Sequence, residues 1–120
     1  MGSAAVDITP PPGMPMGGYF RVRLNTGTLD PLHAKAIVLE QDQVKAALVF
    51  CDLVNLPGGY VNDARRIIQS TTDIPPDHVV ISATHSHTGP EMNHVFLDRL
   101  QGAPAPVARE YRTWLPAKNP

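Results

Sequence analysis

Two histidines, separated by one residue, are the side chains of this chain best suited to chemistry. His85 and His87 follow Val79–Ala83, an apolar run typical of a buried strand. In an extended chain, side chains at i and i+2 point the same way, about 6.5–7 Å apart along the backbone. Both imidazoles could then bind one zinc ion, with Zn–N distances of about 2.0–2.1 Å. The pair predicts a metal site at a strand end, where open α/β sheets place their sites; two solvated histidines are the alternative.

Other residues near this pair in the predicted fold are weaker candidates. His94 could supply a third zinc ligand, although loop histidines are usually solvated. Asp52, at the end of an apolar strand, could orient a zinc-bound histidine, but a carboxylate of a strand-end turn is the simpler interpretation. In the preceding glycine-rich loop, Gly18 permits close backbone approach and Tyr19 offers a hydroxyl near an oxyanion. Cys51 is expected to be a small buried hydrophobe.

The pattern of apolar residues predicts the elements that must position these side chains. A short strand over 4–8 is followed by two strands over 32–40 and 44–53, which we expect to form a hairpin. Helical spacing over 60–69 and the apolar run over 79–83 then complete a βαβ unit. We therefore expect an α/β fold, with a short N-terminal strand, a β-hairpin and a βαβ unit forming part of a larger catalytic domain. Within the strand over 44–53, residues 46–50 are continuously apolar, as expected when both faces are covered, and a further helix is predicted over 107–115.

Composition excludes several classes of protein. The 120 residues carry a net charge of −1 without a basic cluster, which argues against nucleic acid as a partner. One cysteine permits no internal disulfide. No apolar run reaches the roughly 18 residues of a transmembrane helix, and residues 1–12 show no signal peptide. The compartment stays open.

Four ordered segments resemble the N-terminal region of the neutral/alkaline non-lysosomal ceramidase family. The most specific is Thr84-His85-Ser86-His87-Thr88-Gly89-Pro90. The full segments read DITP at 7–10, MGGY at 16–19, LHAKAIVL at 32–39 and ISATHSHTGP at 81–90. The resemblance covers about residues 4 to 90.

The resemblance implies a function and residue roles. The family uses one zinc ion (Zn2+) to cleave the N-acyl amide of ceramide, so the implied substrate is a ceramide-like lipid amide. His85 would be the first zinc ligand, and His87 would lie beside the metal, contacting the substrate or the oxyanion. Relatives are often secreted or membrane-associated.

The family's remaining functional residues have no counterpart here. It completes its zinc shell with another histidine, a glutamate and a tyrosine, and uses a serine, all farther downstream in longer chains. We therefore expect residues 1–120 to be the N-terminal segment of the catalytic domain, with its remainder downstream, and little or no amidase activity from this chain alone. Two alternatives stay open: a catalytically incomplete remnant or metal-binding domain, and an amidohydrolase-type metal hydrolase that uses a His-x-His strand end.

Overall fold

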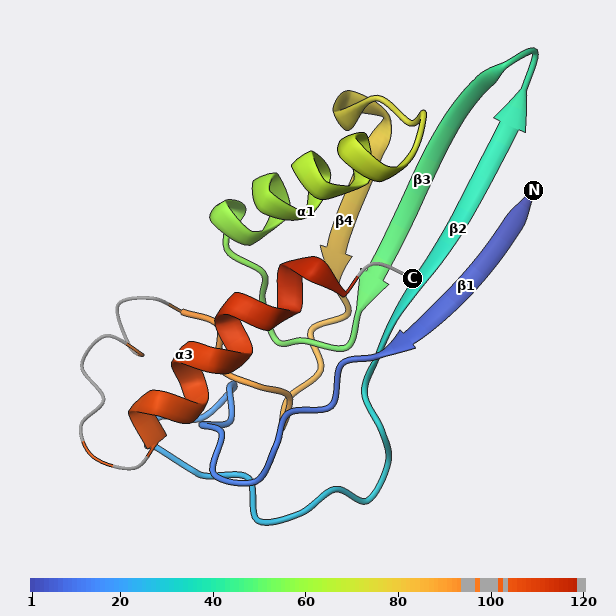
Figure 1. Ribbon diagram of the computed structural model, residues 1–120. Helices are drawn as coiled ribbons and strands as arrows, with labels where there is room; N and C mark the ends of the chain where they lie inside the picture. The colour runs from blue at the N-terminus through green and yellow to red at the C-terminus, as the bar shows by residue number, and fades with distance from the viewer. Residues whose placement is uncertain (94–96, 98–101, 103, 119–120) are drawn as a thin grey trace.

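A four-stranded mixed sheet forms the centre of the computed structural model, which describes residues 1–93, 97, 102 and 104–118 (Figure 1). Its strands lie side by side in chain order; the first and second pairs of neighbours are antiparallel, whereas the last pair is parallel. They are β1 (Gly2–Asp7), β2 (His33–Gln41), β3 (Val44–Cys51) and β4 (Val79–Ala83). The predicted α/β class, with an N-terminal strand, a hairpin and a βαβ arrangement, is confirmed.

The β2–β3 hairpin closes through a two-residue turn. Asp42 and Gln43 both have positive φ, +50° and +68°, between the paired residues Gln41 and Val44. Two consecutive left-handed residues give the turn whose twist matches that of the strands, usually with Asn-Gly. The predicted strands leave three residues, 41–43, for the turn. The observed turn has two, because Gln41 pairs with Val44, and it contains no glycine.

Within residues 1–93 and 104–118, two α-helices and two 3-10 helices accompany the sheet. They are α1 (Gly58–Thr71), η1 (Pro76–His78), α3 (Pro104–Trp114) and η2 (Leu115–Ala117). In α1, Tyr60, Ala64 and Ile68 recur every four residues and are buried, which gives the helix one apolar stripe toward the sheet. The predicted helices over 60–69 and 107–115 are both present. In the part of the chain that the structure describes, no helix combines the length and apolarity needed to cross a bilayer.

The core lies on one face of the sheet, beneath α1 and α3. Alternate strand residues point to it, as the two-residue period of a strand requires. The residues buried there are Ala34, Ala36, Ala47, Val49, Cys51 and Val79. Three of the six are alanines, whose small side chains let helices approach the sheet closely. Between α1 and β4, Arg65 donates from Nε and Nη2 to the Val79 carbonyl at 2.9 and 2.7 Å, although its position in the helical pattern predicts a solvated side chain.

The opposite face of the sheet is apolar but exposed. Ile37 pairs with Leu48, and Leu48 with Val80, so neighbouring apolar side chains join across three strands. Val80 is 51% exposed and Phe50 is 42% exposed. The prediction that β3 is covered on both faces is therefore wrong for the described residues. A continuous apolar run does not reveal how many layers cover a strand, because it records only the side chains of that strand.

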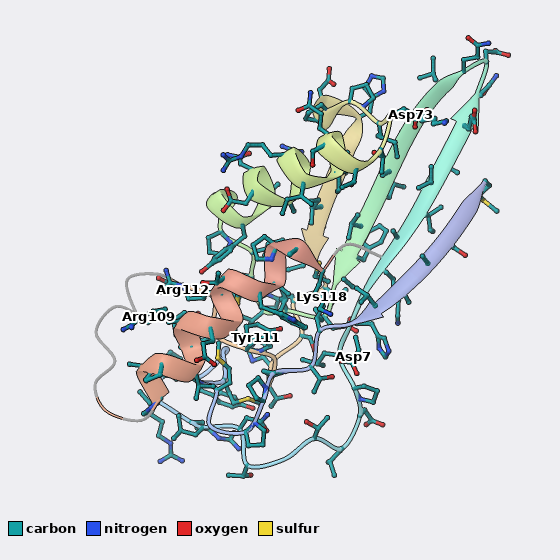
Figure 2. All side chains as sticks on the ribbon, in the orientation of Figure 1. Asp7, Asp73, Arg109, Tyr111, Arg112 and Lys118 are labelled. Carbon is teal, nitrogen blue, oxygen red and sulfur yellow. The ribbon has the colours of Figure 1, made fainter. Side chains whose placement is uncertain are left out.

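Helix α3 is fastened to the segment that follows β1. The Tyr111 hydroxyl, labelled in Figure 2, donates a hydrogen bond to the carbonyl of Ile8, which is fully buried. Burial raises the pKa of the Tyr111 hydroxyl well above its ordinary value, so this hydroxyl stays a donor. Residues far apart in the sequence thereby enclose the core between the last helix and the first loop.

Candidate metal centre after strand β4

A tight turn carries the two histidines beyond β4. The parallel pairing with β3 extends past the strand, because Thr84 N–H donates to Cys51 and Ser86 N–H donates to Leu53 at 2.9 and 3.0 Å. Between these bonds, His85 takes a left-handed φ of +62°. The i, i+2 prediction assumed an extended strand, whereas the pair lies in a turn. Non-glycine residues in this region cost about 1–3 kcal/mol and gather at functional sites.

The rings nevertheless converge. Nε2 of His85 lies 3.3 Å from Nε2 of His87, with ring centroids 5.1 Å apart and planes at 69°. On the other side of its ring, His85 Nδ1 lies 2.9 Å from the Val54 carbonyl oxygen. Because a carbonyl can only accept, Nδ1 carries the proton, and the Nε2 lone pair of neutral His85 faces His87.

This arrangement fits two ligands of a zinc ion. In a tetrahedral shell with Zn–N bonds of about 2.0–2.1 Å, neighbouring nitrogens are separated by about 3.3–3.4 Å, which matches the observed Nε2 separation. Metal-binding histidines typically donate their second N–H to a carbonyl or carboxylate, as His85 does to Val54. Without a metal, the same distance suits a hydrogen bond from His87 N–H to His85. No group of three or more His, Cys, Asp or Glu side chains able to hold a metal occurs among the described residues.

The Gly17–Tyr19 loop lies against the pair. Gly17 N–H donates to the Gly89 carbonyl at 2.8 Å, which joins this loop to the histidine turn. Gly18 has φ of +89°, and a Cβ there would lie 2.6 Å from His87 Nδ1. Glycine is required for both reasons, and its absent side chain leaves the space that the His87 ring occupies. The Tyr19 ring stands edge-on to His87, at 6.4 Å between centroids.

Asp52 anchors the base of the turn. Its Oδ2 accepts from the His33 backbone N–H at 3.0 Å, and its Oδ1 accepts from Thr84 Oγ1 at 3.3 Å. The carboxylate thus joins the start of β2 to the end of β4. Among the described residues, these two hydrogen bonds of Asp52 involve neither imidazole of the pair; Asp52 instead holds Thr84, which precedes His85. Among the described groups, the Val54 carbonyl orients His85 instead.

A cavity of about 500 Å³ lies beside the pair. Ser86 and Thr88, which flank His87 in sequence, line one part of it, and Tyr19 and Arg23 line another. The Arg23 guanidinium stacks 4.3 Å from the centre of the Tyr19 ring. The cavity therefore offers hydroxyl groups and a cation beside the turn that carries the histidines, although neither histidine is among its lining residues.

The remaining candidates lie elsewhere. His94 lies outside the described residues. His78 Nδ1 is 2.8 Å from the Lys45 carbonyl, at the far end of β3. Cys51 is buried in the core, and burial, together with the nearby Asp52 carboxylate, raises the pKa of its thiol to about 11. A thiol that stays protonated in the core behaves as the small hydrophobe that we expected.

The Val54 carbonyl is the functional group that sequence reasoning missed. A backbone carbonyl has no side-chain signature, and the two residues are 31 positions apart. The only available signal was that Val54 follows a strand predicted to lie next to β4. Comparisons of this chain with protein-family models, curated proteins and solved structures find no match.

Proposed function

We propose that the histidine pair is part of a zinc centre that hydrolyses the N-acyl amide bond of ceramide or a related N-acyl lipid. The observation that carries the proposal is the Val54 carbonyl, which directs the Nε2 lone pair of His85 toward Nε2 of His87. The similarity of residues 84–90 to the ceramidase signature supports the choice of reaction.

Each histidine has a distinct role in this proposal. His85 would hold the zinc through Nε2, while its Nδ1–H stays with the Val54 carbonyl. Bound zinc would polarise the amide carbonyl and lower the pKa of its water to about 7. His87 would not bind the metal in this candidate: its Nε2–H would donate to the oxyanion that develops on the amide oxygen. Gly18, packed on the other side of this ring, keeps the donor in place.

His85 alone does not complete a catalytic shell, which usually has three protein ligands and an open position. The proposal therefore assigns the missing ligands to the remainder of a catalytic domain, downstream of these residues. The 3.3 Å separation of the two Nε2 atoms, which fits both as zinc ligands, favours a second candidate, a metal-binding module without catalysis. An amidohydrolase-type enzyme acting on polar amides is distinguished from both by its substrate.

Zinc titration tests the metal centre directly. We expect the chain to bind one Zn²⁺ weakly in competition with a chromogenic chelator. His85→Ala should abolish this binding, and His87→Ala should weaken it. The matched control is His33→Ala, which removes a histidine that lies at the start of β2 and should leave binding unchanged. Equal zinc binding by wild type and His85→Ala would refute the site.

Hydrolysis tests the reaction. This chain alone is expected to show little or no zinc-dependent turnover, whereas a polypeptide that supplies the missing ligands should cleave N-acyl sphingoid bases. Cleavage of polar amides alone would refute the lipid assignment. Bound zinc without turnover in the completed polypeptide would favour the metal-binding module.

A further inference from the structure

The segment between β1 and β2 exposes large apolar side chains. Phe20 and Leu29 are fully exposed, and Val22 and Leu24 are about half exposed. Single exposed apolar residues are common, but four lie within ten positions of this one segment, and such a concentration favours an interaction surface. The segment forms the end of the molecule opposite the hairpin tip, drawn in blue to cyan in Figure 1.

Arginine supplies the cations of this segment, and its one acidic residue, Asp30, lies near its end. Residues 8–29 contain no aspartate, glutamate, lysine or histidine, and their only charged side chains are Arg21 and Arg23. Both arginines are exposed and alternate with Phe20, Val22 and Leu24. Apolar side chains interleaved with cations suit the interface of an anionic bilayer, where the rings and aliphatic chains enter the acyl boundary and the guanidinium groups meet phosphates.

The patch is presented on a braced loop. Met16 N–H donates to Arg23 and Asn25 N–H donates to Met14, each at 2.8 Å, so residues 14–16 and 23–25 run antiparallel. Below them, the buried side-chain amide of Asn25 donates to the carbonyl of Pro10 at 3.0 Å. Residues 17–22 are therefore the tip of a short ribbon whose base is fixed, and ordering the tip on a surface costs little further entropy.

The same ribbon borders the candidate centre. Tyr19, Arg23 and Leu24 of the ribbon, together with Leu29 beyond it, line the cavity that Ser86 and Thr88 also line. The apolar sheet face differs from this patch, because it is a flat layer of strand side chains typical of a packing surface and does not border the cavity. A lipid held at the ribbon would lie beside the histidine pair.

We propose that residues 19–29 dock the protein onto an anionic phospholipid surface, inserting Phe20 and Leu29 while Arg21 and Arg23 contact the phosphates. The docking would bring a lipid amide from the bilayer to the cavity, and this part of the inference rests on the proposed function. Binding to the bilayer itself requires neither zinc nor hydrolysis.

Vesicle flotation tests the docking. We expect binding to vesicles of phosphatidylcholine mixed with phosphatidylglycerol, weaker binding to phosphatidylcholine alone, and weakening with salt. Substituting both Arg21→Gln and Arg23→Gln should reduce affinity about 25-fold, at about fivefold per cation. Substituting both Phe20→Ser and Leu29→Ser should reduce it by at least about tenfold. The matched control, Leu39→Ser with Val44→Ser, removes exposed apolar side chains from β2 and β3 and should bind as wild type does.

A second readout reports insertion. Phe20→Trp should show a blue-shifted emission with anionic vesicles, and circular dichroism should confirm that each variant is folded. His85→Ala should bind vesicles as wild type does, so failure of docking and failure of the zinc centre are separable. Absence of vesicle binding, or equal binding by the Phe20/Leu29 variant, would overturn the proposal. Dimerisation that Phe20→Ser abolishes, without vesicle binding, would assign the surface to a second copy instead.

Discussion

At the scale of single residues, the candidate centre depends on one missing side chain. The His87 ring occupies the place where a Cβ at Gly18 would lie, and the same glycine has a positive φ. Gly13 has nearly the same φ, +87°, but its Cβ would meet only Val107 at 3.9 Å. Substitutions at the two glycines therefore distinguish the cost of a Cβ at positive φ from the cost of a close contact with His87.

Gly18→Ala is predicted to disturb the centre, and Gly13→Ala is its matched control. Both should lose about 1–2 kcal/mol of unfolding free energy, the cost of a left-handed residue with a Cβ. Only Gly18→Ala should also displace His87 and lower zinc affinity, by about tenfold as for other losses of ligand support. Urea denaturation and zinc titration measure the two effects. Equal zinc affinities for the two variants would show that the Gly18 contact does not hold the ring.

At the scale of elements, α3 connects the end of the described chain to the beginning of the fold. Tyr111 supplies this connection through the Ile8 carbonyl. Trp114, the only tryptophan, lies 5.4 Å from Tyr111 between ring centroids. Its fluorescence therefore reports on the docking of α3 separately from the sheet.

Tyr111→Phe should destabilise the docked helix by about 1–3 kcal/mol, because the Ile8 carbonyl would remain buried without its donor. The urea transition followed by Trp114 fluorescence should move to lower concentration. Tyr19→Phe serves as the control and should change stability by less than about 0.5 kcal/mol. An unchanged transition for Tyr111→Phe would mean that α3 is held by apolar contacts alone.

At the scale of the whole molecule, the sheet has one covered face and one exposed apolar face. Val49 points to the helices and is 7% exposed, whereas Val80 points away and is 51% exposed. Both are valines on the parallel strand pair, so they differ chiefly in what covers them. They provide a direct test of the layer arrangement.

Val49→Thr should cost about 1–3 kcal/mol, because it places a hydroxyl in the covered core. Val80→Thr should change the unfolding free energy by less than about 0.5 kcal/mol and should increase solubility. Chemical denaturation together with sedimentation velocity would measure both. A comparable cost at Val80 would reveal that the exposed face is covered in solution, for example by a second copy of the chain.

The sequence by itself determined the elements and their order. Alternation and helical spacing are local properties. The strand over 79–83 and the helical spacing of apolar residues in α1 could therefore be found without coordinates. The signature over 84–90 likewise drew attention to His85 and His87. These features depend on neighbouring side chains, which a sequence records in full.

Only the tertiary structure decided how the site is held. The histidines come together for another reason than the predicted extended strand: His85 lies in a turn with left-handed φ, and the Val54 carbonyl orients its ring. Asp52 binds His33 and Thr84 rather than the pair, and Gly18 matters through the space it leaves for His87. Backbone carbonyls and missing side chains act through distance in space, which no local pattern of residue types encodes.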